Sequence, residues 1–216
     1  MRHDLVLFDL DGTISDPLVG IERSMNFALA RFGHRSLERH EVAVLVGPPL
    51  DQAFTRVTGS TSDAEVNGLV EAYRERYADI GFVENVVYPG VGDALERLHA
   101  GGLAMAVCTS KRRDFALRIL ELFGLADLFH FVDGGDVGVE KWQQIEAMRG
   151  DGRVTERSLM IGDRAVDIDA ARKNGLASGA ATWGFGSREE LEGARPDSWY
   201  EAPGDWLALL GPDVDP

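Results

Sequence analysis

The chain has 216 residues, of which 44% are hydrophobic and 27% charged, and its 22 basic residues against 36 acidic ones leave a formal charge of −14. This composition is typical of a folded globular protein, and the length predicts one large domain or a core with a small second unit. The acidic balance argues against nucleic acid and against an anionic membrane surface as partners, because both attract clustered lysine and arginine.

Cysteine content and targeting signals exclude further classes. Cys108 is the single cysteine, so neither an intramolecular disulfide nor a multi-cysteine zinc site can form. It lies in an apolar run that favours a buried side chain over a reactive thiol. The first four residues lead directly into a strand-like segment without a signal-peptide pattern, and no apolar run approaches the ~20 residues of a membrane span. We therefore expect a soluble, cytoplasmic protein.

Short apolar runs alternate with helical patterns along most of the chain. Residues 5–8 form a continuous apolar run that ends at Asp9, which predicts a buried parallel strand. Further strands are expected at residues 103–108, 128–132, 158–161 and 177–182, and helices that stop near a glycine at 91–99, 115–123 and 165–174. This alternation predicts an α/β fold with a doubly wound, Rossmann-like parallel sheet.

One interval is too long for a single crossover helix. Nearly a hundred residues separate the first two predicted strands, and they include a helix start at Asp16-Pro17 and a helical stretch at residues 69–77. We interpret residues 15–82 as an all-helical cap inserted after the first strand, with residues 1–14 and 83–216 as the core. Residues 47–50 are either a loop that reaches the substrate or a plain turn between helices.

Polar side chains stand where the predicted strands end. In an open parallel sheet these ends meet at one edge, where ligands bind. The candidates are Asp9, Asp11, Thr109, Ser110, Lys141, Asp163 and Asp167. Clustered carboxylates require a cation, and hard oxygen ligands select Mg²⁺.

This set of groups suits phosphoryl transfer. A metal ion and a lysine would neutralise a phosphoryl group, which the hydroxyls of Thr109 and Ser110 would orient. Asp9 suits attack on phosphorus to give an acyl phosphate, and Asp11 suits proton transfer to the leaving group and from water.

Each motif also has a purely structural interpretation. Residues 9–13 could be an Asx-type turn that closes a strand, whereas a calcium loop is disfavoured because its sixth position is Ile14 rather than glycine. Asp163 and Asp167 could be the N-cap and a first-turn acid of a helix. Either hydroxyl residue after the second strand could cap the next helix.

Taken together, the motifs resemble the four-motif signature of the haloacid dehalogenase superfamily. Residues 9–13, Thr109, Lys141 and residues 162–167 follow one another in the order of that signature. The long insertion resembles the helical cap of the phosphoglycolate phosphatase-like branch, and residues 183–187 are similar to that branch as well.

The resemblance implies a role for each matching residue. Asp9 would be the nucleophile and Asp11 the general acid and base, with Thr109 and Lys141 on the phosphoryl group. Mg²⁺ would bind the Asp9 carboxylate, the Asp11 main-chain carbonyl and Asp163, with Asp167 in support.

Two basic residues, Lys111 and Arg164, each keep two possible roles. Family members often have proline after the motif-three lysine, but Trp142 follows Lys141 here. Lys111 is therefore a competing phosphate ligand, although it is most simply part of a solvated basic cluster. Arg164 either touches the substrate or pairs with a neighbouring acid.

The expected activity is hydrolysis of a small phosphorylated metabolite by a Mg²⁺-dependent phosphomonoesterase, through an aspartyl phosphate. Phosphoglycolate and nucleoside monophosphates are both candidate substrates. A phosphomutase would use the same core, whereas a dehalogenase has no use for the metal cluster or for Asp11. A phospho-aspartate receiver module is normally smaller and has no cap. Monomer and homodimer both stay open.

Overall fold

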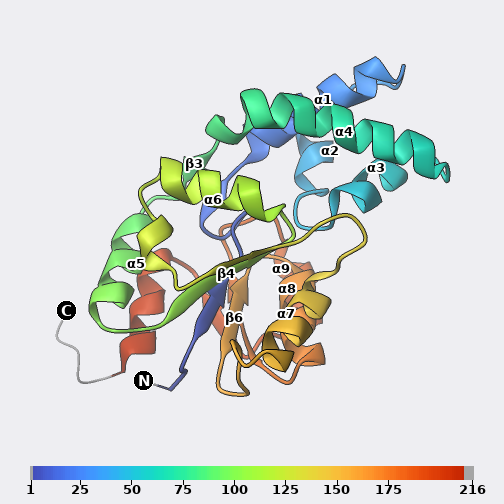
Figure 1. The fold of residues 1–216 in the computed structure, drawn as a ribbon. Helices are drawn as coiled ribbons and strands as arrows, with labels where there is room; N and C mark the ends of the chain where they lie inside the picture. The colour runs from blue at the N-terminus through green and yellow to red at the C-terminus, as the bar shows by residue number, and fades with distance from the viewer. Residues whose placement is uncertain (1, 212–216) are drawn as a thin grey trace.

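A parallel six-stranded sheet forms the centre of the computed structural model, which describes residues 2–211 (Figure 1). The strand order is β5-β4-β1-β6-β7-β8, and every neighbouring pair is parallel. The strands are β1 (Val6–Phe8), β4 (Met105–Thr109), β5 (Val132–Gly134), β6 (Leu159–Gly162), β7 (Ala177–Ala181) and β8 (Ser198–Tyr200).

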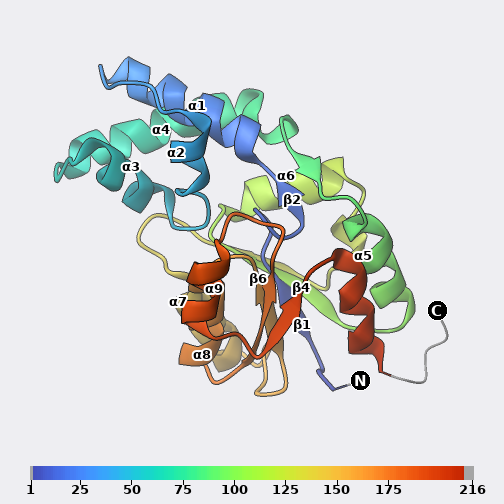
Figure 2. The ribbon, with the colours of Figure 1, turned by 180° about the vertical axis from the view of Figure 1, so that it is seen from behind.

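Helices cover both faces of this sheet, so the predicted doubly wound α/β fold is confirmed. One face carries α5 (Val91–Ala100), α6 (Arg113–Leu122) and the 3-10 helix η3 (Pro203–Leu210). The other carries α7 (Lys141–Gly150), α8 (Ala165–Lys173) and α9 (Arg188–Ala194) (Figure 2).

The first strand shows why its sequence is apolar throughout. Successive side chains of a strand point to opposite faces. Val6 and Phe8 accordingly pack under α5 and α6, whereas Leu7 packs under α7 and α8. Cys108 is buried in the second of these cores, as predicted, and burial raises the pKa of its thiol.

Between β1 and β4 the chain forms a layer of helices above the carboxyl ends of the strands (Figure 1). The cap helices are α1 (Leu18–Arg31), α2 (Arg39–Ala43), α3 (Leu50–Thr58) and α4 (Asp63–Asp79), followed by the 3-10 turn η1 (Gly81–Val83). Two short antiparallel strands, β2 (Ser15–Asp16) and β3 (Val86–Val87), lie where the chain leaves and re-enters the sheet domain.

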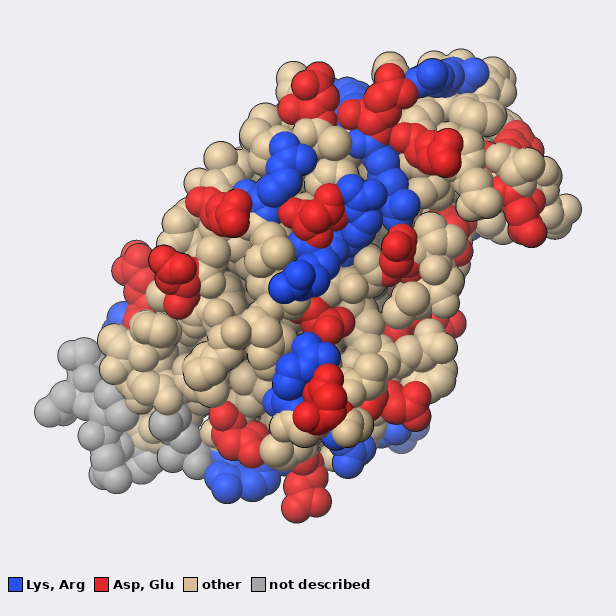
Figure 3. All heavy atoms as spheres, viewed as in Figure 1, with Lys and Arg blue, Asp and Glu red and all other residues tan. Residues whose placement is uncertain are grey.

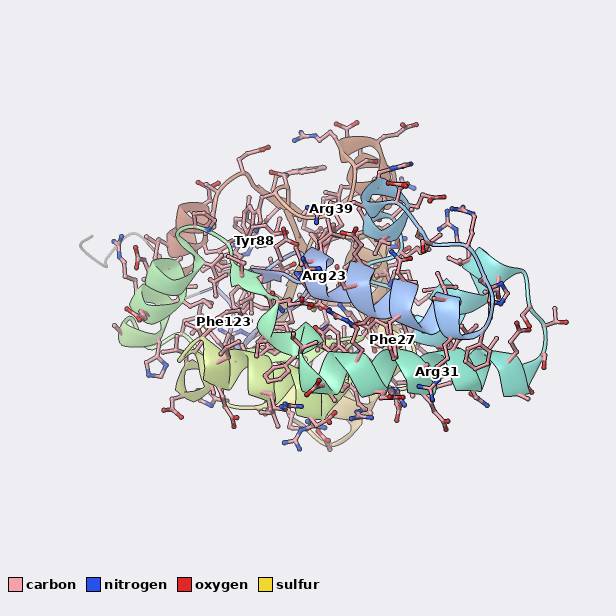
Figure 4. All side chains as sticks on the ribbon, turned by 90° about the horizontal axis from the view of Figure 1, so that it is seen from above. Arg23, Phe27, Arg31, Arg39, Tyr88 and Phe123 are labelled. Atoms are coloured by element: carbon pink, nitrogen blue, oxygen red, sulfur yellow. The ribbon has the colours of Figure 1, made fainter. Side chains whose placement is uncertain are left out.

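The cap helices share a hydrophobic core of their own. Leu29 of α1, Phe54 of α3 and Leu69 of α4 are fully buried in it. Helix α1 begins at Leu18, so Pro17 is its N-cap rather than its first helical residue, and Asp16 Oδ1 accepts a hydrogen bond of 2.9 Å from the amide of Leu18. Seen from above, α1 and α4 lie side by side, and the labelled Phe27 stands on α1 (Figure 4).

One predicted strand is wrong. Residues 128–132 were expected to form it, but β5 begins only at Val132, and Ala126–Leu128 is a 3-10 turn. The apolar run reflects burial of Phe129 in the core rather than strand pairing. The short strands β2, β3 and β8 were not predicted. Among residues 2–211, no helix is both long enough and apolar enough to cross a membrane.

Candidate active site

Three acidic side chains meet where β1 and β6 end. Asp9 follows β1, Asp163 follows β6, and Asp167 lies in the first turn of α8. Parallel register places Phe8 opposite Ile161, and the amide of Asp9 donates to the Ile161 carbonyl over 2.9 Å. One carboxylate oxygen from each of the three acids lies within 4.8 Å of the others, and all three side chains are buried.

Lys141, the first residue of α7, offsets only part of the negative charge of these three carboxylates. Its Nζ lies 2.9 Å from Asp9 Oδ1 and donates to Asp167 Oδ1. Three carboxylates against one ammonium leave two negative charges in a buried space. Burial, together with the charges of Asp167 and Asp9, therefore raises the pKa of Asp163 well above its usual value.

The donor set fits a hard divalent cation. All of the candidate ligands are oxygens, and a charge of two would neutralise the cluster. Asp9 Oδ1 is buried and forms an ion pair with Lys141 Nζ over 2.9 Å, but it accepts no well-aligned hydrogen bond from the described residues, so it keeps lone pairs for an ion. The acids of this cluster would hold such a cation.

Glycines keep space free around Asp163. A Cβ on Gly12, whose φ is +92°, would lie 2.2 Å from Asp163 Oδ2, and a Cβ on Gly184 would lie 2.3 Å from Asp163 Cβ. The loop of residues 183–187 can therefore close over the carboxylate, where the Phe185 amide donates to Oδ2 over 2.8 Å. Thr13 Oγ1 donates to Oδ1 over 3.0 Å, which fixes the other oxygen.

Asp11 has a lysine of its own. Lys111 Nζ lies 2.7 Å from Asp11 Oδ2 and donates to the hydroxyl of Tyr77 on α4 over 2.9 Å. The prediction of a solvated cluster is thus wrong for Lys111, whose side chain is 7% exposed because Tyr77 of the cap covers it. Burial raises the pKa of Asp11, and Lys111 opposes that shift.

The two hydroxyl side chains lie beside these acids. Thr109 is buried, and its Oγ1 accepts from the amide of Lys111 over 3.2 Å. Ser110 Oγ is buried without a hydrogen-bond partner among the described residues. Asp9, Asp11, Thr109 and Ser110 all line one cavity of about 90 Å³ between the sheet and the cap helices.

The remaining predicted residues lie beside this cavity without lining it. Lys141, Asp163 and Asp167 are buried in contact with Asp9 or near it, and none of the three is among the described residues that line the cavity. Arg164 pairs with Glu190 over 2.9 Å and donates to the carbonyl of Val46. The alternative of pairing with a neighbouring acid is therefore the one observed for Arg164.

The sequence did not predict most of the residues that the cap helices contribute to the lining of the cavity. Gly47, Pro48 and Leu50 line it, which matches the first of the two alternatives for that loop. Tyr77 and Arg74 line it from α4, although the sequence marks them only as members of a helical pattern. A contact between α4 and the strand ends depends on the tertiary fold, so no local signal reveals it.

Comparison with known proteins identifies the family. Residues 6–181 match the haloacid dehalogenase-like hydrolases. A 5'-nucleotidase of Pseudomonas aeruginosa is 37% identical, in an alignment that covers 91% of this chain and 90% of the nucleotidase. A phosphoglycolate phosphatase of Vibrio parahaemolyticus is 32% identical, in an alignment that covers 95% of each chain. The crystal structure of a predicted phosphatase from Clostridium acetobutylicum superposes with a TM-score of 0.90 at 32% identity, covering 97% of this chain and 99% of that one. The chain belongs to the haloacid dehalogenase-like hydrolases, as an enzyme of their phosphoglycolate phosphatase-like branch.

Proposed function

We propose that the protein is a Mg²⁺-dependent phosphomonoester hydrolase that acts on a small phosphorylated metabolite through an aspartyl phosphate. One observation carries the proposal. Asp9 lines the cavity, pairs with Lys141 over 2.9 Å, and belongs to an acidic cluster whose excess charge matches a divalent cation.

Asp9 and Asp11 divide the chemistry between them. A carboxylate oxygen of Asp9 attacks phosphorus, and the bond from phosphorus to the leaving oxygen breaks as Asp11 gives that oxygen a proton. Water then attacks the phosphorus of the aspartyl phosphate and gives a proton to Asp11. The bond from phosphorus to the Asp9 oxygen breaks, inorganic phosphate leaves, and the Asp9 carboxylate is restored. Burial raises the pKa of Asp11, which favours its acidic role in the first step.

The neighbouring residues would bind and orient the phosphoryl group. Ser110 Oγ has no partner among the described residues and Thr109 lies next to it, so both are placed to donate to phosphoryl oxygens. Lys141 would offset the negative charge shared by Asp9 and the phosphoryl group. Mg²⁺, held by Asp9, Asp163 and the Asp11 carbonyl with Asp167 in support, would supply further positive charge.

The cap would exclude bulk water during the reaction. In this proposal residues 15–82 are the cap domain, and residues 1–14 and 83–216 are the catalytic core. Helix α4 contributes Tyr77 and Arg74 to the cavity, and the loop before α3 contributes Gly47 and Pro48. The names of the relatives support two substrates, phosphoglycolate and a nucleoside monophosphate.

Turnover of p-nitrophenyl phosphate tests the proposal. We expect activity with Mg²⁺, loss of activity on chelation, and a loss of at least a thousandfold in Asp9→Asn. Asp169→Asn is the matched control, because Asp169 is exposed on α8 and pairs with Arg172. Full activity of Asp9→Asn would refute the proposed nucleophile.

A further inference from the structure

The cavity wall provided by the cap and by α6 is hydrocarbon and aromatic. Apart from Arg74, it is lined by apolar and aromatic residues, which include Met25, Leu50, Ala53, Tyr73, Tyr77 and Phe115. The rings of Tyr73 and Tyr77 stack with centroids 5.2 Å apart and planes 13° apart, and Phe115 meets Tyr77 edge-on. Burial raises the pKa of both tyrosines well above the usual value, so both phenols stay neutral.

Every cation among the described residues that line the cavity already has a carboxylate partner. Lys111 lies 2.7 Å from Asp11. Arg74 of α4 lies 2.7 Å from Asp136, in the loop that follows β5. On the outer face, basic and acidic side chains stand interleaved over α4 and α6 (Figure 3).

The third cation, Arg112, is paired in the same way. Its Nε and Nη2 donate to the two carboxylate oxygens of Asp114, and its guanidinium lies 4.5 Å from the centroid of the Phe115 ring. An anionic leaving group that enters the cavity would therefore be desolvated without gaining a free cation. A flat uncharged ring would instead contact the aromatic wall.

We infer that the cavity selects phosphomonoesters whose leaving group is an uncharged, ring-bearing alcohol, such as a nucleoside or a phenol, over leaving groups that carry their own carboxylate, such as glycolate. This inference rests on the proposed phosphomonoesterase function and chooses between its two candidate substrates. Asp136 is a specificity-determining residue in this scheme, because it occupies Arg74, the cation of the cap that would otherwise recognise a carboxylate.

Two isosteric substrates isolate the charge of the leaving group. 4-Carbamoylphenyl phosphate and 4-carboxyphenyl phosphate have the same ring and nearly the same shape, but only the second has an anionic leaving group. We expect kcat/KM to be at least tenfold higher for the carbamoyl compound. We also expect a nucleoside 5'-monophosphate to be hydrolysed with a higher kcat/KM than 2-phosphoglycolate. Equal or reversed preferences in either pair would overturn the inference.

The role of Asp136 has its own test. Asp136→Asn releases Arg74 from its carboxylate, so the ratio of kcat/KM for the carboxy compound over the carbamoyl compound should rise at least threefold. Asp151→Asn makes the same change in net charge in an exposed pair with Arg153, and it should leave the ratio unchanged. The same shift in both variants, or none in Asp136→Asn, would contradict the assignment.

Binding separates this inference from the proposed function. Calorimetric titration of the Asp9→Asn protein with the two aryl phosphates measures selection without turnover, and the carbamoyl compound should bind more tightly. If the wild-type protein hydrolyses no phosphomonoester, the proposed function fails, and the order of binding still decides the selectivity. If hydrolysis occurs but the order is reversed, only the selectivity fails.

Discussion

Asparagine in place of Asp163 is expected to stabilise the metal-free protein and to remove its response to Mg²⁺. Asp163 shares a buried space with Asp9 and Asp167, with carboxylate oxygens within 4.8 Å of one another. At that separation and an effective dielectric constant of about 20, two like charges repel by about 3 kcal/mol. Lys141 contacts the other two acids and reduces the effect, and uptake of a proton limits it, because burial and the neighbouring charges raise the pKa of Asp163. We therefore expect a gain of about 1–3 kcal/mol in the free energy of unfolding.

The substitution removes the charge with little disturbance of the hydrogen bonds. The amide oxygen of the new side chain can accept from the Phe185 amide, as Asp163 Oδ2 does now. Its NH₂ group can donate to Thr13 Oγ1, because a hydroxyl accepts as well as donates. The buried Thr13 hydroxyl loses its present acceptor in this arrangement, so the change in stability reports the relief of electrostatic repulsion minus the cost of that one hydrogen bond.

Urea unfolding with Mg²⁺ and with a chelator measures both effects. Wild-type protein should gain about 2.7 kcal/mol when Mg²⁺ is at a hundred times its Kd, whereas Asp163→Asn should gain nothing. Asp169→Asn, on the outer side of α8, should resemble the wild type in both conditions. A variant at Asp163 that is less stable than wild type without metal and is still stabilised by Mg²⁺ would refute the reasoning.

Three further changes test other parts of the structure. Gly184→Ala places a Cβ 2.3 Å from Asp163 Cβ, so it should lower kcat/KM at least tenfold while the circular dichroism spectrum stays unchanged. The control Gly193→Ala adds a Cβ that meets nothing within 4 Å and should keep the wild-type kcat/KM. Equal activities of the two variants would contradict the close-packing argument. Glu84→Gln removes a carboxylate whose pKa is raised by burial but lowered more by two arginines of α1 and α4. The stabilisation by the Glu84 carboxylate is present above its unfolded pKa of about 4.3 and is lost as the pH falls through its lower folded pKa. In urea unfolding, the free energy of unfolding of Glu84→Gln should therefore be about 1 kcal/mol below that of the wild type at pH 7, and the difference should vanish in acid. Phe54→Ala should destabilise the core of the cap helices by about 3–5 kcal/mol, because Phe54 is fully buried there. Urea unfolding would show this as a lower midpoint or as a separate early transition. A change below about 1 kcal/mol would contradict the burial of Phe54.

The sheet was predictable because its strands are buried on both faces. Residues 5–8 are apolar at every position, and alternate side chains enter the two cores, so the run itself indicates a central strand. The same rule fails at residues 128–132, where Phe129 is buried by a turn rather than by strand pairing. A hydrophobic run reports burial, and only the backbone hydrogen bonds of the folded chain show whether it pairs.

The acids of the site were predictable because strand ends in a parallel sheet share one edge. Asp9 and Asp163 stand at the ends of neighbouring strands, and Asp167 follows one helical turn later. The environment of Lys111 was not predictable, because Tyr77 covers it from a helix 34 positions away in the sequence. Local sequence gives the identity of that lysine but not its burial.

Arg164 joins the acidic cluster to the cap. Its amide donates to Asp167 Oδ2 over 3.0 Å, while its side chain donates to the carbonyl of Val46, and a Cβ on Gly47 would lie 3.0 Å from Arg164 Cγ. The start of α8 and the loop before α3 are therefore held by one residue. Because interiors are close-packed, a displacement of the α8 N-terminus large enough to move Asp167 also changes the cavity wall that Gly47 lines. The acidic cluster and the cavity wall are thus mechanically connected through Arg164, which is not among the described residues that line the cavity.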